Sequence, residues 1–557
     1  MSTDVPAPRT CSMSGERPMP RMLLTSACQE PRLPRGDLRD EFCYRNTAGQ
    51  GCFSMRQTQS WHPLHLIAQN CACPSTVLEN PSVGRFRHEV ASRQYSIVGI
   101  SFTLATVRMV VRMVRTVRDV SPCSAIVLGG YGTALFRSDS SLLRELAPMV
   151  DYVCPGEGVR FMRDLLAERF GVAAPVPLVQ QLRPIRIGLP FVPWAIAEIP
   201  VIVRALGCRN RCPFCATTHQ YRGARIELVD TDRLHGLLRE VLARRPGTSE
   251  VMVFDEDFLA DRHEALRLRD MLRTDPLIAG SDISLLVFAS VRSVERFTVN
   301  ELADLRIGTV FIGVESAASA PLDSCTAAKR GSEPLDALCS RLHAAGISTI
   351  ASLIVGWDGQ TAAALETERA RFVALNPTLY QVLPLMAMPG TGLWERMARA
   401  ERIRTEVDLE RLQPGQSTVQ FTDLTQDDIR RWMTRTHRDL VAEGGPWFFR
   451  YAENHLAGWR AGFGERHRRA MLRLLPLVMG PGALLLAYRG PYRVRWVRFV
   501  ARMTRMLPVQ LILGMCAGII VLPLLLGLQF LVFATLSLFG RTEQPPYSVT
   551  RYPGRAP

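Results

Sequence analysis

Alternating apolar and polar stretches mark a first α/β unit between residues 95 and 166. Short apolar runs at 95–101, 125–130 and 151–154 predict strands. Between the first two, residues 105–119 predict a helix with one valine-rich side. Strand–helix–strand spacing of this kind favours a parallel sheet with right-handed crossovers. Ligands of such sheets bind at the carboxyl ends of the strands, where Ser101, Gly129 and Gly130 are expected.

A second α/β series follows, with six apolar runs separated by helical patterns. The expected strands are 201–206, 250–254, 283–288, 309–314, 348–355 and 379–384. The expected helices between them include 231–244, 262–273, 335–345 and 361–375. Six such units predict a partial or full β/α barrel, whose chemistry is built on loops at the carboxyl ends of its strands.

These patterns divide the chain into segments. Residues 1–60 are rich in Pro, Arg, Ser and Gly and are expected to be a disordered, basic extension. The first α/β unit takes 61–175, a proline-rich linker 176–200, and the barrel 201–400. A polar helical region is expected at 401–465, followed by a membrane-associated segment at 466–545.

The last segment contains the longest apolar stretch of the chain. Residues 507–538 carry no charge, and about 20 apolar helical residues suffice to cross a bilayer. One tilted span and a re-entrant hairpin bent at Pro523 are both compatible with the pattern, and the alternative is a buried core helix. The broken run 474–487 is expected to be interfacial. Because of the arginines upstream of 507, the protein is expected on the cytoplasmic side of the inner membrane.

Composition narrows this picture only in part. A chain of 557 residues is expected to form two or three folded units. The net charge is +15, and Lys329 is the only lysine. A basic surplus suits nucleic acid or an anionic membrane, and much of it lies beside the apolar tail. The 14 cysteines follow no disulfide framework, and no secretory signal opens the chain, so reduced cytosolic thiols are expected.

The strongest chemical motif is a group of three cysteines directly after the first barrel strand. Cys208, Cys212 and Cys215 can each bind one iron of a cubane cluster, which leaves the fourth iron open to a small-molecule ligand. The alternatives are a zinc site completed by His219, or inert thiols. The cysteines of the amino-terminal extension match no common ligand pattern and are expected to be unpaired; they are Cys11, Cys28, Cys43 and Cys52.

The spacing CxxxCxxC, with the aromatic Phe214, resembles the signature of the radical S-adenosylmethionine (SAM) superfamily across residues 201–395. The resemblance implies a 4Fe–4S cluster, SAM, a 5′-deoxyadenosyl radical and a reductant such as flavodoxin or ferredoxin. Later motifs match in order, at 254–258, 313–316, 353–356 and 389–392. The SAM contacts that they imply are Asp255, Asp257, Glu315, Ser316 and Gly356.

Ordinary structural roles are the alternatives for these residues. The two aspartates would then cap a helix, and Glu315 would belong to an ion pair. Glu256 is expected to point to the other face of its strand.

Residues 61–175 resemble the cobalamin-binding domain that precedes the barrel in one class of this superfamily. Ser101, Gly129 and Gly130 match the positions that admit the nucleotide tail of the corrin. The Asp-x-His-x-x-Gly motif is absent, and His62 and His65 lack its flanking residues. The alternative is a docking domain that has lost the cofactor.

Together these features predict a membrane-associated radical SAM enzyme that methylates an unactivated carbon of a lipid-like substrate with cobalamin. The alternatives are a cobalamin-independent cyclase or carbon–carbon coupling enzyme and, third, an enzyme that modifies tRNA. No RNA-binding module is evident, so nucleic acid is not an expected partner.

Overall fold

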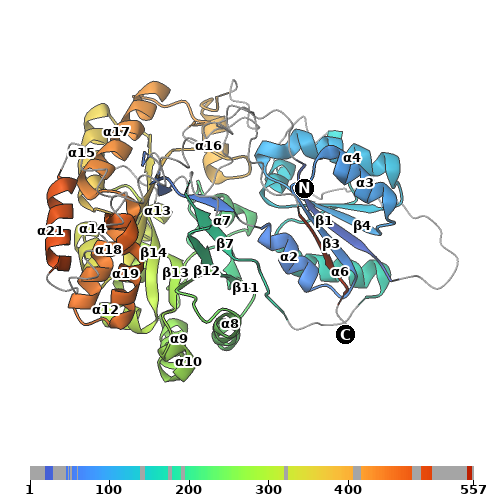
Figure 1. The fold of residues 1–557 in the computed structure, drawn as a ribbon. Helices are drawn as coiled ribbons and strands as arrows, with labels where there is room; N and C mark the ends of the chain where they lie inside the picture. Colours follow the sequence, from blue (N-terminus) through green and yellow to red (C-terminus); the bar gives the residue numbers. More distant parts are fainter. Residues whose placement is uncertain are drawn as a thin grey trace, which may run out of the picture.

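The protein forms two α/β units side by side, with helices of the carboxyl-terminal region on the second (Figure 1). The computed structural model describes residues 19–28, 46–47, 49–50, 53–58, 60–137, 145–172, 178–189, 195–318, 324–404, 416–479, 491–504 and 548–554. The predicted α/β class is confirmed.

The amino-terminal unit is a six-stranded sheet in the order β17-β3-β1-β4-β5-β6. Its strands are β1 (Met22–Ser26), β3 (Ser75–Glu79), β4 (Ile97–Ser101), β5 (Ala125–Gly129), β6 (Tyr152–Val153) and β17 (Ser548–Tyr552). All except β17 run parallel to their neighbours. The five parallel strands have the order 2-1-3-4-5 of doubly wound folds, whose ligands bind where the order reverses, here between β1 and β4.

Helices cover both faces of this sheet. One face packs against α3 (Val83–Ser92) and α4 (Val107–Val120), the other against α2 (His62–Gln69) and α6 (Gly158–Phe170). Successive residues of β1 alternate between the two cores, Leu23 on the first and Met22 and Leu24 on the second. A strand buried on both faces is continuously apolar, as this one is.

The predicted boundary at residue 60 is therefore wrong. β1 lies inside the supposed extension and is the central strand of the sheet, and Cys28 is buried behind it. The sequence pattern did not predict β1, because a strand of five residues among prolines and arginines is too short to show a clear hydrophobic period. The predicted linker is also structured in part, because β7 (Ile185–Gly188) and β8 (Ala197–Ile199) pair with β2 (Arg56–Thr58).

The second unit is a six-stranded parallel sheet in chain order, as predicted. Its strands are β9 (Val201–Val203), β12 (Glu250–Phe254), β13 (Ser284–Ala289), β14 (Ile307–Glu315), β15 (Ser348–Val355) and β16 (Leu379–Pro384). The outer layer includes α8 (Thr231–Arg244), α9 (Arg262–Thr274), α12 (Val299–Asp304), α14 (Leu335–Ala344) and α15 (Ala362–Ala374). The sheet curves into an open partial barrel whose floor is closed by Trp447, Phe448 and Phe53.

The carboxyl-terminal helices pack on this barrel. They are α17 (Gln426–Gly444), α18 (Trp447–Arg460), α19 (Glu465–Met479) and α21 (Tyr492–Thr504). The interfacial assignment is wrong for 474–479, because Leu475, Val478 and Met479 are buried in the core. No helix within the described residues is long and apolar enough to cross a bilayer. The predicted membrane run 507–538 lies outside the described residues.

The thiol prediction holds in part. Among the residues that the structure describes, eight cysteines are free, and six of these are buried. Cys123 is disulfide-bonded, so the expectation of a wholly reduced set is wrong.

Candidate active site

The three-cysteine loop lies at the carboxyl end of the first barrel strand. A two-stranded hairpin, β10 (Ala205–Leu206) and β11 (Ile226–Glu227), frames it, and Cys215 caps the short helix α7 (Ala216–Gln220). The chain enters the loop through Gly207 at φ +83°, where a Cβ would lie 2.2 Å from the carbonyl oxygen of Ala224. Only glycine fits this approach, so the loop geometry depends on that residue.

The thiols are well shielded from water. Cys212 is buried, Cys208 and Cys215 are partly buried, and burial raises the pKa of Cys208 and Cys212 to about 11. A metal must therefore displace protons from these thiols when it binds. Among the described side chains, no three His, Cys, Asp or Glu residues converge on a single metal ion. A cubane needs no such convergence, because each thiolate binds a different iron, so the donor set fits a cluster better than zinc.

Lys329 supplies a fixed positive charge beside this loop. Its ammonium donates to Glu315 Oε1 and lies 5.5 Å from the ring centre of Phe214. Burial alone would lower the pKa of Lys329, but the Glu315 carboxylate raises this pKa above its ordinary value. The same lysine opposes the effect of burial on the Cys212 thiol. Phe214 in turn packs edge-on against Trp357, with ring centres 5.8 Å apart.

The two predicted aspartates have different surroundings. Asp255 is fully buried and accepts hydrogen bonds from Arg225 at 2.6 and 3.3 Å, with Arg204 at 3.9 Å. Asp257 accepts from Asn210 of the cysteine loop at 3.2 Å and from the Ser290 amide at 3.0 Å. Asp257 thus orders the loop, whereas Asp255 is held by arginines, and neither caps the following helix, since Asp261 does.

Glu256 points toward the cysteine loop, contrary to the prediction. Its carboxylate accepts from the Gly207 amide at the start of the cysteine loop, and its Oε2 has no hydrogen-bond partner among the described residues. Burial raises the pKa of Glu256 to about 7. Alternation along an extended strand predicts the opposite face, but the strand ends at Phe254 and the backbone turns before Glu256. A buried acceptor without a partner is suited to a cationic ligand group.

Ser316 and Gly356 are each covered by a neighbour. The Ser316 hydroxyl donates to Glu368 at 2.9 Å and is fully buried. A Cβ on Gly356 would lie 2.3 Å from the ring of Phe421, which packs over that glycine. Contacts of these two residues with SAM stay predictions. To contact SAM, the Ser316 hydroxyl would have to give up its hydrogen bond to Glu368.

Predicted residues of the amino-terminal unit lie at neighbouring strand ends. Ser101 pairs in register with Gly129, and Gly130 follows at φ +88°. A Cβ on Gly130 would lie 2.6 Å from the Phe102 carbonyl oxygen, whereas one on Gly129 would meet only Cys154, at 3.9 Å. Gly130 is thus needed for the turn itself, and Gly129 leaves space at the strand end.

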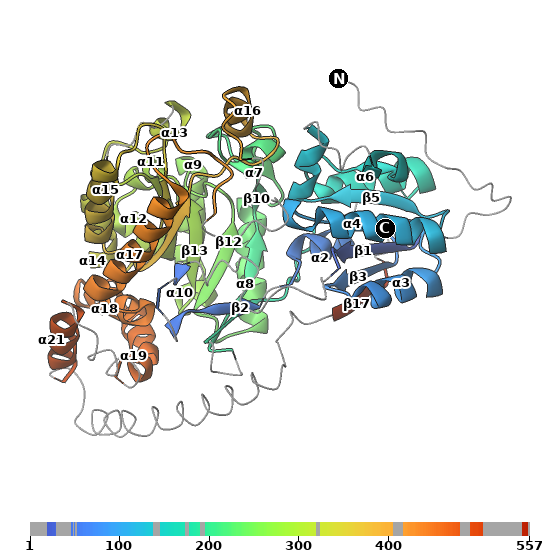
Figure 2. The same ribbon diagram turned by 90° about the horizontal axis from the view of Figure 1, so that it is seen from above.

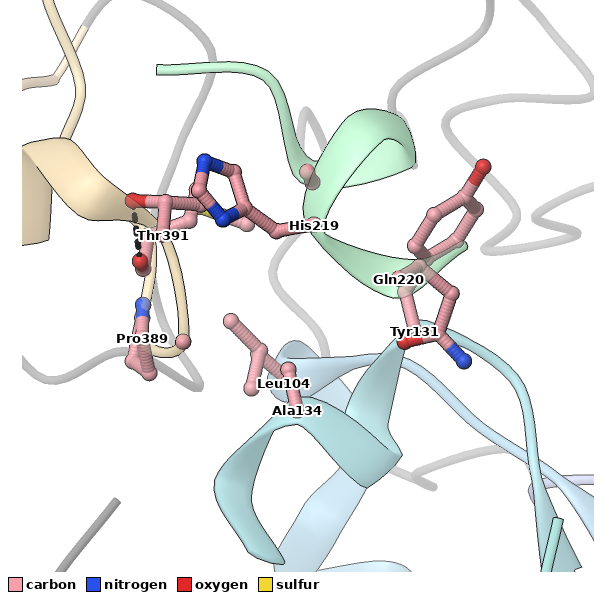
Figure 3. A pocket seen from close by; sticks show the side chains of 10 residues that line it. Leu104, Tyr131, Ala134, His219, Gln220, Pro389 and Thr391 are labelled. Atoms are coloured by element: carbon pink, nitrogen blue, oxygen red, sulfur yellow. Dashed lines mark hydrogen bonds between the residues drawn. The ribbon is translucent and has the colours of Figure 1, made fainter. Parts of the chain in front are cut away.

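Between the two units lies a small cavity that is partly open to solvent (Figure 3). Leu104, Tyr131 and Ala134 line it from the amino-terminal unit, and α7 and the 388–391 loop line it from the barrel. His219 accepts a hydrogen bond from the Gly392 amide at 3.3 Å, so its imidazole holds that loop. In the zinc alternative His219 would be a ligand, and its Nε2 is already engaged by this amide.

Comparison with known proteins identifies the barrel. Residues 202–369 match the family model described as the radical SAM superfamily. The barrel of this protein is a radical SAM domain. Enzymes of this superfamily use a 4Fe–4S cluster and SAM and need a reductant. The assignment of the cluster to the cysteine loop stays a prediction.

Several solved structures are similar to this chain in part. The radical SAM methyltransferase TsrM from Kitasatospora setae, with cobalamin and a 4Fe–4S cluster bound, is 15% identical, with 69% of this chain and 75% of that chain covered and a TM-score of 0.48. The cobalamin-dependent SAM radical enzyme OxsB is 14% identical, with 73% and 65% covered and a TM-score of 0.43. Coproporphyrinogen III oxidase (HemN) from Escherichia coli is 19% identical, with 36% and 46% covered and a TM-score of 0.26. No curated protein matches the sequence.

Proposed function

We propose that this enzyme uses cobalamin to methylate an unactivated carbon of a lipid-like substrate at the cytoplasmic face of a membrane. When bound, the cluster and SAM supply one-electron cleavage of a carbon–sulfur bond, and cobalamin supplies the methyl group. The residues of the chain bind and orient these groups and exclude water from them.

The observation that carries the proposal is the meeting of the two sheets at their carboxyl ends. Tyr131, after β5, lies 3.0 Å from Thr217 of α7, hydroxyl to hydroxyl. Gln220 of α7 donates to Thr133 at 3.2 Å. A ligand at the carboxyl edge of the amino-terminal sheet would therefore face the helix that begins at Cys215.

The amino-terminal edge fits a nucleotide-like tail better than it fits a whole corrin. Gly129 leaves space at the strand end, whereas the cavity between the two units is small and partly open to solvent. A corrin is far larger, so its entry requires the Tyr131 loop to move away from α7. No imidazole is offered to cobalt by His62 or His65, which are hydrogen-bonded to Arg183 and Tyr552.

An apolar substrate is supported by the inner wall of the barrel. Phe254, Phe288 and Phe311 lie on three successive strands, with ring centres 5.8 Å apart in the stacked first pair and 5.2 Å apart in the tilted second pair. All three are partly exposed above a floor of buried apolar residues. Partly exposed aromatic rings inside a barrel gain free energy when an apolar chain covers them.

Lys329, Phe214 and Glu256 have complementary tasks around such a substrate. Lys329 places positive charge beside thiolates that carry negative charge when metal-bound. The ring of Phe214 lies against this lysine and is itself packed on Trp357. The unpartnered Oε2 of Glu256 offers an acceptor for the ammonium of SAM.

The test is anaerobic purification of the full chain from cells supplied with cobalamin. We expect bound corrin, cleavage of SAM to 5′-deoxyadenosine on reduction, and lipids from cells lacking the gene that are lighter by one methylene. Gly129→Leu should lower corrin content, while the matched Gly84→Leu, at a site with nothing within 4 Å of a new Cβ, should not.

The outcomes separate the alternatives. SAM cleavage without bound corrin would contradict cobalamin-dependent methylation and favour the cobalamin-independent cyclase or coupling reaction. Unchanged lipids together with altered tRNA would overturn the substrate class.

A further inference from the structure

Two polar side chains of the barrel strands lie side by side without a hydrogen-bond partner. Ser352 of β15 pairs in register with Gln381 of β16, so the two side chains are neighbours on the same face of the sheet. Only 7% of Ser352 and 5% of Gln381 is exposed. Neither side chain hydrogen-bonds to another group within the part of the chain that the structure describes. Buried polar groups are nearly always paired, so these two are suited to a ligand.

Alternation along the two strands directs this pair into the barrel. Ile350 and Leu379, two residues earlier on each strand, belong to the apolar core that closes the barrel floor. Ala351 and Tyr380 point the other way, into the core beneath α14 and α15. These two helices lie on the outer side of the sheet in both views (Figures 1 and 2). The Ser352–Gln381 pair is therefore part of the inner wall.

The aromatic side chains of the inner wall lie one step below this pair. Phe288 pairs in register with Phe311, Phe311 with Ile350, and Ile350 with Leu379, so one apolar row crosses the four strands. The Ser352–Gln381 pair comes two residues later on its strands. At about 3.3 Å per residue, it lies about 7 Å above this row, toward the carboxyl ends of the strands.

On the β14 side, the pair borders the ion pair of Lys329 and Glu315. Gly313 pairs in register with Ser352, and a Cβ on Gly313 would lie 2.7 Å from Glu315 Oε1 and 3.2 Å from Lys329 Nζ. The two opposite charges neutralise each other, so the surroundings favour a neutral ligand group. A carboxylate placed here would be a buried charge without a free partner. The Gln381 amide offers both a donor and an acceptor, which matches an amide or a hydroxyl.

We propose that Gln381 and Ser352 bind a neutral amide or hydroxyl group of the substrate, while its apolar part covers the aromatic row below. This inference rests on the proposed function and deepens it by naming the substrate class. The substrate is an apolar molecule that carries a neutral hydrogen-bonding group, in contrast to a pure hydrocarbon or a free acid. Gln381 and Ser352 are then residues that determine specificity.

The binding site is tested by ligand-observed NMR on the purified full chain with three probes of equal chain length: hexanamide, 1-hexanol and hexanoate. The two neutral probes should bind more tightly than hexanoate. Gln381→Met keeps the length of the side chain and removes its amide, so it should weaken both neutral probes on the order of fivefold. The matched control is Gln426→Met on α17, whose amide donates to the Val419 carbonyl, and it should leave every affinity unchanged. Unaltered binding of the neutral probes to Gln381→Met, or tighter binding of hexanoate, would overturn the site.

Thermal unfolding of the same variants separates binding from folding. The Gln381 amide has no hydrogen bond to lose, and an apolar side chain removes an unpaired polar group from the interior. Gln381→Met should therefore unfold at the same temperature as the wild type or at a higher one. A lower Tm would show that the amide supports the fold, and would contradict its assignment to a ligand.

The affinity for SAM is measured separately, by equilibrium dialysis with the anaerobically reconstituted chain. Gln381→Met should leave the Kd of SAM unchanged, because the amide is assigned to the substrate. A tenfold weaker binding of SAM would assign the amide to SAM and overturn the proposal. Probe binding depends neither on SAM cleavage nor on the lipids of cells lacking the gene, so failure of this site and failure of the proposed function are distinguishable.

Discussion

The ion pair between Lys329 and Glu315 offers the sharpest test of the cluster-site geometry. Lys329→Met leaves the Glu315 carboxylate buried without its partner. Glu315→Gln likewise leaves the Lys329 ammonium buried without a carboxylate. Both side chains are shielded, with 13% and 7% of their surfaces exposed. Removing one member of a buried pair costs about 3–5 kcal/mol, and the remaining exposure places this pair near the lower value.

The double variant should recover part of that loss, because no unpaired charge is left. We expect a coupling free energy of about 2 kcal/mol between the two sites. The pKa of Lys329 is raised in the folded state. The pair therefore stabilises the folded protein fully below the unfolded-state pKa of lysine, and this stabilisation is lost only as pH rises through the higher folded-state pKa. The coupling should therefore be constant from pH 6 to about pH 9.

The assay is urea unfolding of the metal-free protein for the wild type, both single variants and the double variant. A matched cycle on Arg341 and Glu333, a pair of the same barrel with 26% and 23% of the side chains exposed, serves as control and should give less than about 1 kcal/mol. Equal coupling in the two cycles would refute the buried pair as a structural support of the loop.

Three further predictions address other parts of the site and fold. Cys212→Ala, reconstituted anaerobically, should lose its iron, whereas Cys339→Ala, a buried thiol away from the loop, should keep about four irons per chain; retained iron in the first variant would contradict the ligand assignment. Because the folded-state pKa of Glu256 is near 7 and its ordinary value is 4.5, stability is full below pH 4.5 and falls as pH rises to 7. Glu256→Gln should flatten this decline, by at most about 3 kcal/mol in thermal unfolding between pH 5 and 8, and an unchanged slope would exclude the raised pKa. Tyr552→Phe removes the hydroxyl that contacts His65 and should cost about 1 kcal/mol, with no loss indicating that β17 contributes little to the sheet.

The barrel was readable from sequence because its elements are long and regular. Six apolar runs at nearly constant spacing, each followed by a helical period, predicted the strands from β9 to β16 within a few residues. Only part of the amino-terminal sheet could be predicted from the sequence. β4 and β5 have flanking helices and glycine ends, whereas β1 is five residues long and is isolated among prolines.

What the sequence determined is the chemistry that local spacing encodes. Three cysteines within eight residues after a strand are brought together by chain connectivity alone, and the same holds for the order of the later motifs. Tertiary structure decided everything that depends on partners distant in the chain. It paired the only lysine with Glu315, turned Ser316 to Glu368, and directed Glu256 toward Gly207. It also joined residues 548–552 to a sheet that begins at residue 22, a contact that no local pattern encodes, because strand pairing is set by which edge is left open once the rest has folded.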